Sequence, residues 1–342
     1  MTASIPRPGP THRPGARLRA GAGTRPRLGF LLWGLATLLL AVAFRAAGWS
    51  NVAGMGPRIH TAWLLMALCG NLAIQLFAAL QWRLLLPASA RIRPRKMLSI
   101  TALSSLAMST APMMLGHAST AALLARQPGI CAGTALSVIA LDQLTEGIVK
   151  LTVVLLAILM LPVPDWMQAG AAGLAGLVAL LLVGLLLAAR RHDVLARWAA
   201  SGAKPRSLLS LAARWADRLE TLRTPRRFLA ALSACFGMKL VEGLGIVATQ
   251  HALGIPLPTS SAIFLLAAAG LGTMLPLAPG NVGTYEASVF LAYRRLGVSS
   301  GDALALAVVQ HLAYLAAATG SGYVVLSLKQ LRAWRGARAV PG

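Results

Sequence analysis

The sequence is poor in acidic residues, in charged residues of either sign and in cysteine. Asp and Glu supply only 9 of the 342 residues, and all charged residues together make up 12% of the chain. Soluble globular proteins average about 25% charged residues, so the composition excludes an ordinary soluble domain. Hydrophobic residues make up 57% of the sequence. The composition therefore predicts an integral membrane protein.

The three cysteines exclude two further classes of site. Cys69, Cys131 and Cys235 all lie within apolar runs and have no paired spacing, so we expect neither a disulfide framework nor a zinc site. We interpret them as small buried hydrophobic residues. The sequence also contains no HExxH, GxSxG or CxxC motif. We therefore expect no metal ion, no cofactor and no hydrolytic catalytic site.

The basic residues have the distribution of a membrane protein. A net charge of +23 is also typical of proteins that bind nucleic acid, but here Lys and Arg lie in the segments between apolar runs. The positive-inside rule expects this pattern, so nucleic acid is not an expected partner. Most of the 32 Lys and Arg fall on one side when both termini are placed in the cytoplasm. We predict a multi-pass protein of the bacterial plasma (inner) membrane.

The apolar runs divide the chain into two tails and a membrane domain. Residues 1–27 read as a disordered basic cytoplasmic tail, residues 28–328 as the membrane domain and residues 329–342 as a basic C-terminal tail. Residues 28–44 are interpreted as a retained helix, with a cleaved signal peptide as the alternative. Residues 190–227 form a basic cytoplasmic loop, whose apolar spacing predicts an interfacial helix. We expect this loop to hold anionic lipids of the inner leaflet.

Five further apolar runs are long enough to cross a bilayer, which requires about 20 residues. They are residues 61–82, 131–161, 168–189, 228–252 and 302–328. With residues 28–44, they predict about six full spans.

Residues 97–126 form an apolar segment that is interrupted in its middle. Pro112 and Gly116 separate two halves, each shorter than the ~20 residues that a span needs. Basic residues flank both ends, so we predict a re-entrant hairpin that enters and leaves on the cytoplasmic side. One long kinked helix is the alternative.

Residues 261–297 are interrupted in the same way, by Pro279, Gly280 and Gly283. Broken backbone at membrane depth persists only where it is buried in protein or lines a hydrated cavity. Glu286 follows the break within about one turn, and a carboxylate at that depth is costly unless it is paired or hydrated. This segment is the first candidate for a functional site.

The two interrupted segments resemble each other. Residues 111–116 (APMMLG) align with residues 278–283 (APGNVG) at an offset of 167, and a long apolar run follows each. The second segment must enter from outside if the last run is to end in the cytoplasm. The expected fold class is therefore an all-α polytopic membrane protein of about six full spans plus two re-entrant helical hairpins of opposite orientation, an inverted repeat.

Polar residues inside apolar segments usually carry function. The candidates for substrate binding or proton coupling are Asp142, Glu146, Lys239, Glu242, Glu286 and His311. Helical spacing also allows local neutralisation of Glu146 by Lys150 and of Lys239 by Glu242, which would merely tie helices together. Asp142 and Glu286 have no such neighbour, and we expect them to face each other across the midplane. For His311 we expect a polar contact at the helix break rather than a general base.

The run LAPGNVGTYEASVFLAYRRLGV, residues 277–298, resembles the Pro-Gly-x-x-Gly-x-x-Glu signature of the flippase-like family, which is the lysylphosphatidylglycerol synthase transmembrane-region family. The QWRLL run at residues 81–85 and the DQLTE run at residues 142–146 are similar to this family as well, and the latter resembles its hopanoid-associated subgroup. The first interrupted segment departs from the family pattern, because no acid follows Pro112 before Asp142.

This resemblance implies lipid handling without an enzymatic step. In full-length synthases the aminoacyl transfer resides in a separate soluble domain, which we expect to be absent here. We predict a translocator, or a lipid-transport component, that moves a polar-headgroup lipid through a midplane cavity. One alternative is a non-catalytic membrane partner of a glycosyltransferase or of a hopanoid or lipid-modification enzyme. The other, an enzyme acting on a lipid-linked substrate, lacks a recognisable nucleophile or metal site.

Overall fold

Each long apolar run of the described sequence forms one long helix. The computed structural model describes residues 59–90, 92–111, 113–190, 224–274 and 278–338. The long helices in these ranges are α3 (Thr61–Leu85), α6 (Ala132–Met160), α7 (Asp165–Arg190), α10 (Pro225–Ala252) and α13 (Ser300–Arg338). All five are long and apolar enough to cross a membrane, which confirms a multi-pass membrane protein. Within the described ranges the structure contains no strand.

Several predicted features lie outside the described residues. They are the tail at residues 1–27, the first helix at residues 28–44, Pro112, the interfacial helix expected within residues 191–223, and residues 339–342.

The predicted helix bounds are close to the observed ones, with two informative differences. α10 begins at Pro225, three residues earlier than expected, because proline is well suited to the first position of a helix. α13 continues ten residues beyond the predicted end at Leu328 and reaches Arg338. The sequence LKQLRAWR over residues 328–335 consists mainly of good helix formers, so the loss of hydrophobicity there does not end the helix.

The two interrupted segments form pairs of short helices. α4 (Pro94–Thr110) is followed by α5 (Met113–Ala125), and α11 (Ser260–Gly272) by α12 (Thr284–Arg295). The members of each pair pack against one another. A Cβ atom on Gly116 would lie 2.6 Å from the sulfur of Met108, so α5 folds back onto α4. The alternative of one kinked helix over residues 97–126 is therefore wrong.

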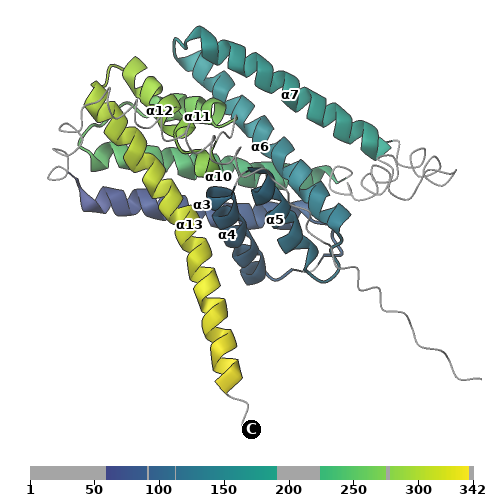
Figure 1. Cartoon of the computed structure of the whole chain (residues 1–342). Helices are drawn as coiled ribbons and strands as arrows, with labels where there is room; N and C mark the ends of the chain where they lie inside the picture. The colour runs from purple at the N-terminus through teal and green to yellow at the C-terminus, as the bar shows by residue number, and fades with distance from the viewer. Residues whose placement is uncertain (1–58, 91, 112, 191–223, 275–277, 339–342) are drawn as a thin grey trace, which may run out of the picture.

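The helices assemble around a central pair, α3 and α10, which lie side by side (Figure 1). α13 crosses this pair and contacts α3, α4 and α12, while α6 and α7 pack together on the other flank. The short 3₁₀ helix η3 (Pro279–Asn281) lies between α11 and α12 and contacts α4. The tip of the second helix pair therefore meets the first pair inside the helical assembly.

The outer surface of the assembly is apolar. Leu159 on α6 is 82% exposed and Leu180 on α7 is 71% exposed, as expected for side chains that face lipid rather than water. Cys235 is buried, but Cys69 and Cys131 are exposed. The interpretation of all three cysteines as buried residues is therefore wrong, because an apolar run also supplies the lipid-facing surface.

Candidate functional site

The break between α11 and α12 is a turn built from residues with positive φ. Gly280 has φ of 64°, Asn281 57° and Gly283 86°, a region in which glycine has no steric penalty. Pro279 starts the single 3₁₀ turn, and Gly283 is the residue before α12. This geometry brings the backbone of residues 280–283 close to the first turn of α12, which carries Glu286.

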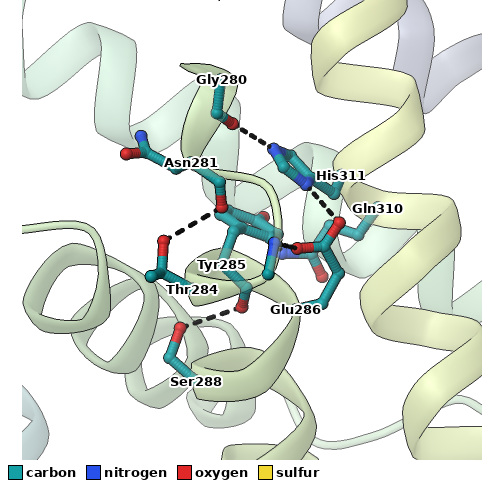
Figure 2. Close-up of polar contacts among 9 residues, drawn as sticks. Gly280, Asn281, Thr284, Tyr285, Glu286, Ser288, Gln310 and His311 are labelled. Atoms are coloured by element: carbon teal, nitrogen blue, oxygen red, sulfur yellow. Dashed lines mark hydrogen bonds and ion pairs between the residues drawn. The ribbon is translucent and has the colours of Figure 1, made fainter. Parts of the chain in front are cut away.

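Glu286 is buried and both of its carboxylate oxygens have partners. Its side chain accepts a hydrogen bond from the backbone N–H of Gly283 at 2.7 Å through Oε2. This is the acidic half of a capping box, a device that satisfies a free N–H at a helix start. The other oxygen, Oε1, lies 2.8 Å from Nδ1 of His311, a residue of α13 (Figure 2). The costly carboxylate is thus paired by tertiary contact.

His311 joins this carboxylate to the broken backbone. Its Nε2 lies 2.9 Å from the carbonyl oxygen of Gly280 (Figure 2), and a carbonyl oxygen only accepts, so Nε2 must carry a proton. One further proton lies between Nδ1 of His311 and Oε1 of Glu286. Whichever atom holds it, the pair is neutral overall. The polar contact that we predicted for His311 at the helix break is confirmed.

Two tyrosines and a glutamine extend the network along α12 and α13. The ring of Tyr285 stacks on the imidazole of His311, with ring centroids 4.3 Å apart. The amide nitrogen of Gln310 donates to the hydroxyl of Tyr285, and the amide oxygen of Gln310 accepts from the hydroxyl of Tyr293 at 3.1 Å. The α12–α13 contact therefore consists of a chain of polar groups whose members are fully or nearly buried.

The charged residues of α6 and α10 form two local pairs, as one of our interpretations proposed. Nζ of Lys150 lies 2.8 Å from Glu146, and Nζ of Lys239 lies 2.7 Å from Glu242. The four side chains remain between 20% and 36% exposed. They are therefore neither fully buried in the protein nor fully exposed on its outer surface.

These four residues, which we call the charged cluster, are close enough to interact with one another across helices. Glu146 interacts electrostatically with Lys239, and also with His117 of α5. Glu242 interacts with Tyr314 and Tyr285. Since the rings of Tyr285 and Tyr314 both stack on His311, the aromatic residues connect the cluster to the Glu286–His311 pair.

Asp142 has a different partner from the one expected. Its Oδ1 accepts a hydrogen bond from the indole N–H of Trp82 on α3 at 3.0 Å, and one turn away Gln81 donates to Thr145 at 2.7 Å. Within the described residues, no contact joins Asp142 to Glu286. Asp142 also interacts electrostatically with Glu146, so it borders the charged cluster from the α3 side.

The structure places the predicted site residues in two adjoining groups. Glu286, His311, Pro279, Gly280 and Gly283 form the break centre, and Glu146, Lys239 and Glu242 belong to the charged cluster, with Asp142 beside it. Gly116 lies in the α4–α5 packing.

Sequence reasoning missed the aromatic members of the site, Trp82, Tyr285 and Tyr314. Their signal was the presence of hydroxyl or indole groups in otherwise apolar helices, since such groups usually find a partner when buried.

One family model matches residues 28–322 of the chain, and it describes the lysylphosphatidylglycerol synthase TM region. No curated protein and no solved structure is a match. The match includes every residue of the break centre and of the charged cluster.

Proposed function

Because the chain belongs to the lysylphosphatidylglycerol synthase TM region family, which indicates a role connected with membrane lipids, we propose that it moves a polar-headgroup lipid from one leaflet to the other. It would act as a multi-pass protein of the bacterial plasma membrane, with both termini in the cytoplasm. The headgroup would pass the charged cluster while the acyl chains stay in the bilayer. The proposal contains no covalent step.

The observation that carries the proposal is the partial exposure of the charged cluster. Four charged side chains on membrane-spanning helices cost free energy that the fold alone does not require. Full burial would suit a purely structural pair, but these side chains are 20–36% exposed. Alternating Lys and Glu side chains offer donors to a lipid phosphate and acceptors to hydroxyl or amino groups of a headgroup.

The break centre contains the Glu286–His311 pair, whose shared proton can move between two atoms without a change in the net charge of the pair. The proton shared by Glu286 and His311 can reside on either atom while the pair stays neutral. Transfer of that proton to the charged cluster would leave the pair with a net negative charge and would alter the field at the cluster. We therefore propose that Glu286 and His311 couple proton movement, or a conformational change of the break, to passage of the headgroup.

The meeting of the two helix pairs supports the same proposal. η3 contacts α4, so the broken backbone of one pair lies against the other pair near the polar groups. In transporters built from inverted repeats, substrate sites lie where such discontinuous helices meet. We propose that α4–α5 and α11–α12 are re-entrant hairpins of opposite orientation.

The direct test measures transbilayer movement of fluorescent lipids in proteoliposomes, followed by quenching of the outer-leaflet label. The variant Glu286→Gln keeps an acceptor for the N–H of Gly283 and a donor for Nδ1 of His311, but it cannot give up its proton. We expect it to insert normally and to lose at least about a hundredfold in flip rate, the lower end of the effect of one missing proton-transfer group.

The matched control is Asp302→Asn. Asp302 lies in the first turn of α13 and bonds to Ser299, so the same chemical change there should leave the flip rate unaltered. Wild-type flipping by Glu286→Gln would contradict the proton-coupling role, and wild-type protein without flipping activity would contradict translocation itself.

A further inference from the structure

A cavity of about 590 Å³ lies where α3 ends and where α4 and α10 begin. Each of these elements contributes one arginine to its wall: Arg83 from the last turn of α3, Arg93 from the residue before α4, and Arg227 from the first turn of α10. None of the eleven described residues that line it is Asp or Glu. None of these described lining residues belongs to the break centre or to the charged cluster.

Arg227 is held in place by the end of α3. Its Nη2 donates to the carbonyl oxygen of Leu86 at 2.9 Å. A guanidinium group has five N–H donors in a fixed fork. Within the described residues its hydrogen bonds, to the carbonyl oxygens of Leu86 and Arg83, use only this one nitrogen. The other donors are therefore already oriented, and little conformational freedom is lost when they bind an anion.

The surroundings of the cavity are also positively charged. Lys96 on α4 interacts electrostatically with Lys329 on α13, so the end of α13 lies on the same basic side as the starts of α4 and α10. The N-termini of α4 and α10 add partial positive charge. Arginine forks match the oxygen atoms of a phosphate, so a phosphate-type anion is the ligand that this chemistry favours.

The apolar part of the cavity indicates that the anion belongs to a lipid. Leu80 lines the cavity and continues a stripe on the outer face of α3, where Leu72, Leu76 and Leu80 are 41%, 59% and 46% exposed. These residues follow each other at four-residue spacing, so they lie on one side of a membrane-spanning helix. A soluble phosphate has no apolar part that could contact these leucines, whereas an acyl chain can lie along them.

We propose that this cavity binds an anionic phospholipid, with its phosphate on Arg83, Arg93 and Arg227 and one acyl chain along Leu80, Leu76 and Leu72. The site goes beyond the proposed translocation, because it lies at the basic ends of the helices and its occupancy is independent of any flipping activity.

Native mass spectrometry of the full-length protein tests the site with two probes, dioleoylphosphatidylglycerol and dioleoylphosphatidylcholine. The test variant is Arg83→Gln/Arg93→Gln, which leaves the Arg227–Leu86 contact intact. The matched control is Arg126→Gln/Arg332→Gln, which removes the same charge from exposed positions outside the cavity. We expect the first phosphatidylglycerol to bind the test variant about thirtyfold more weakly, and the control within about threefold of wild type.

A conservative variant keeps the test valid if the glutamine substitutions disturb folding. Arg83→Lys/Arg93→Lys retains the charge but loses the bidentate fork, so its affinity for phosphatidylglycerol should be intermediate. Equal weakening by the test and control pairs would overturn the proposal, as would equal affinity of the wild-type protein for the two lipids. Displacement of phosphatidylglycerol by glycerol 3-phosphate at equal concentration would assign the cavity to a soluble phosphate instead.

Discussion

Gly280 packs closely against Ser109, where the two helix pairs meet. A Cβ atom on Gly280 would lie 3.1 Å from the carbonyl oxygen of Ser109, and also 3.1 Å from the side chain of Leu315. The contact is between the break of one pair and the end of α4 in the other. The backbone of residue 280 is therefore constrained twice, by its positive φ and by its neighbours.

The substitution Gly280→Ala should destabilise the protein. A non-glycine residue in the left-handed region costs about 1–2 kcal/mol, and the new methyl group would press on α4 and α13. The matched control is Gly129→Ala, because Gly129 has a similar φ of 78° but nothing within 4 Å of its Cβ position. In thermal unfolding in mild detergent, Gly280→Ala should lower the melting temperature more than Gly129→Ala. Equal shifts would mean that the contact between the pairs adds nothing to stability.

The packing of α13 on α4 offers a second test, at Gly322. A Cβ atom there would lie 2.4 Å from Cβ of Leu106 and 2.7 Å from the carbonyl oxygen of Ala102, so the helices must separate to admit it. We expect Gly322→Ala to lower the free energy of unfolding by about 1–3 kcal/mol, the usual cost of overpacking. Gly320→Ala, two residues earlier on the same helix, meets nothing within 4 Å and should be neutral or slightly stabilising. Denaturant titration gives the free energy of unfolding of both variants. An unchanged value for Gly322→Ala would contradict the close approach of α13 to α4.

The Lys239–Glu242 pair allows a double-mutant cycle. Lys239→Met leaves the carboxylate of Glu242 without its 2.7 Å partner at membrane depth. Because the pair is only partly buried, this should cost about 1–2 kcal/mol, between the values for exposed and buried pairs. The double variant Lys239→Met/Glu242→Gln removes both charges and should be more stable than Lys239→Met alone. The free energy of unfolding of all four proteins, including Glu242→Gln, gives the coupling between the two side chains. Additive effects would show that the pair contributes no interaction energy, which would contradict the close ion pair.

Much of the fold follows from the sequence because length and hydropathy are local properties. The runs that became α3, α6 and α7 were predicted within a few residues, and the break at Pro279 was predicted because proline and glycine end helices wherever they occur. The pairing of Lys239 with Glu242 was foreseeable for the same reason, since their spacing on one helix brings them together.

The tertiary partners of the carboxylates did not follow from the sequence. Glu286 lies 25 residues from His311 and Asp142 lies 60 residues from Trp82, so these contacts depend on the rotation and crossing of whole helices. In a sequence of this composition many rotations bury similar apolar faces. The expected meeting of Asp142 with Glu286 rested on depth alone, and depth does not fix which side of a helix faces the centre.

The length of α13 has a mechanical consequence. The helix runs for 39 residues from Ser300 to Arg338, and its C-terminal end extends beyond the other helices (Figure 1). At about 1.5 Å per residue, its far end lies roughly 40 Å from His311, so a tilt of about 10° at the histidine would displace that end by about 7 Å. A small rotation of α13 at His311, the partner of Glu286, would therefore become a large displacement at its C-terminal end. A spin label near that end would report small rearrangements of the break.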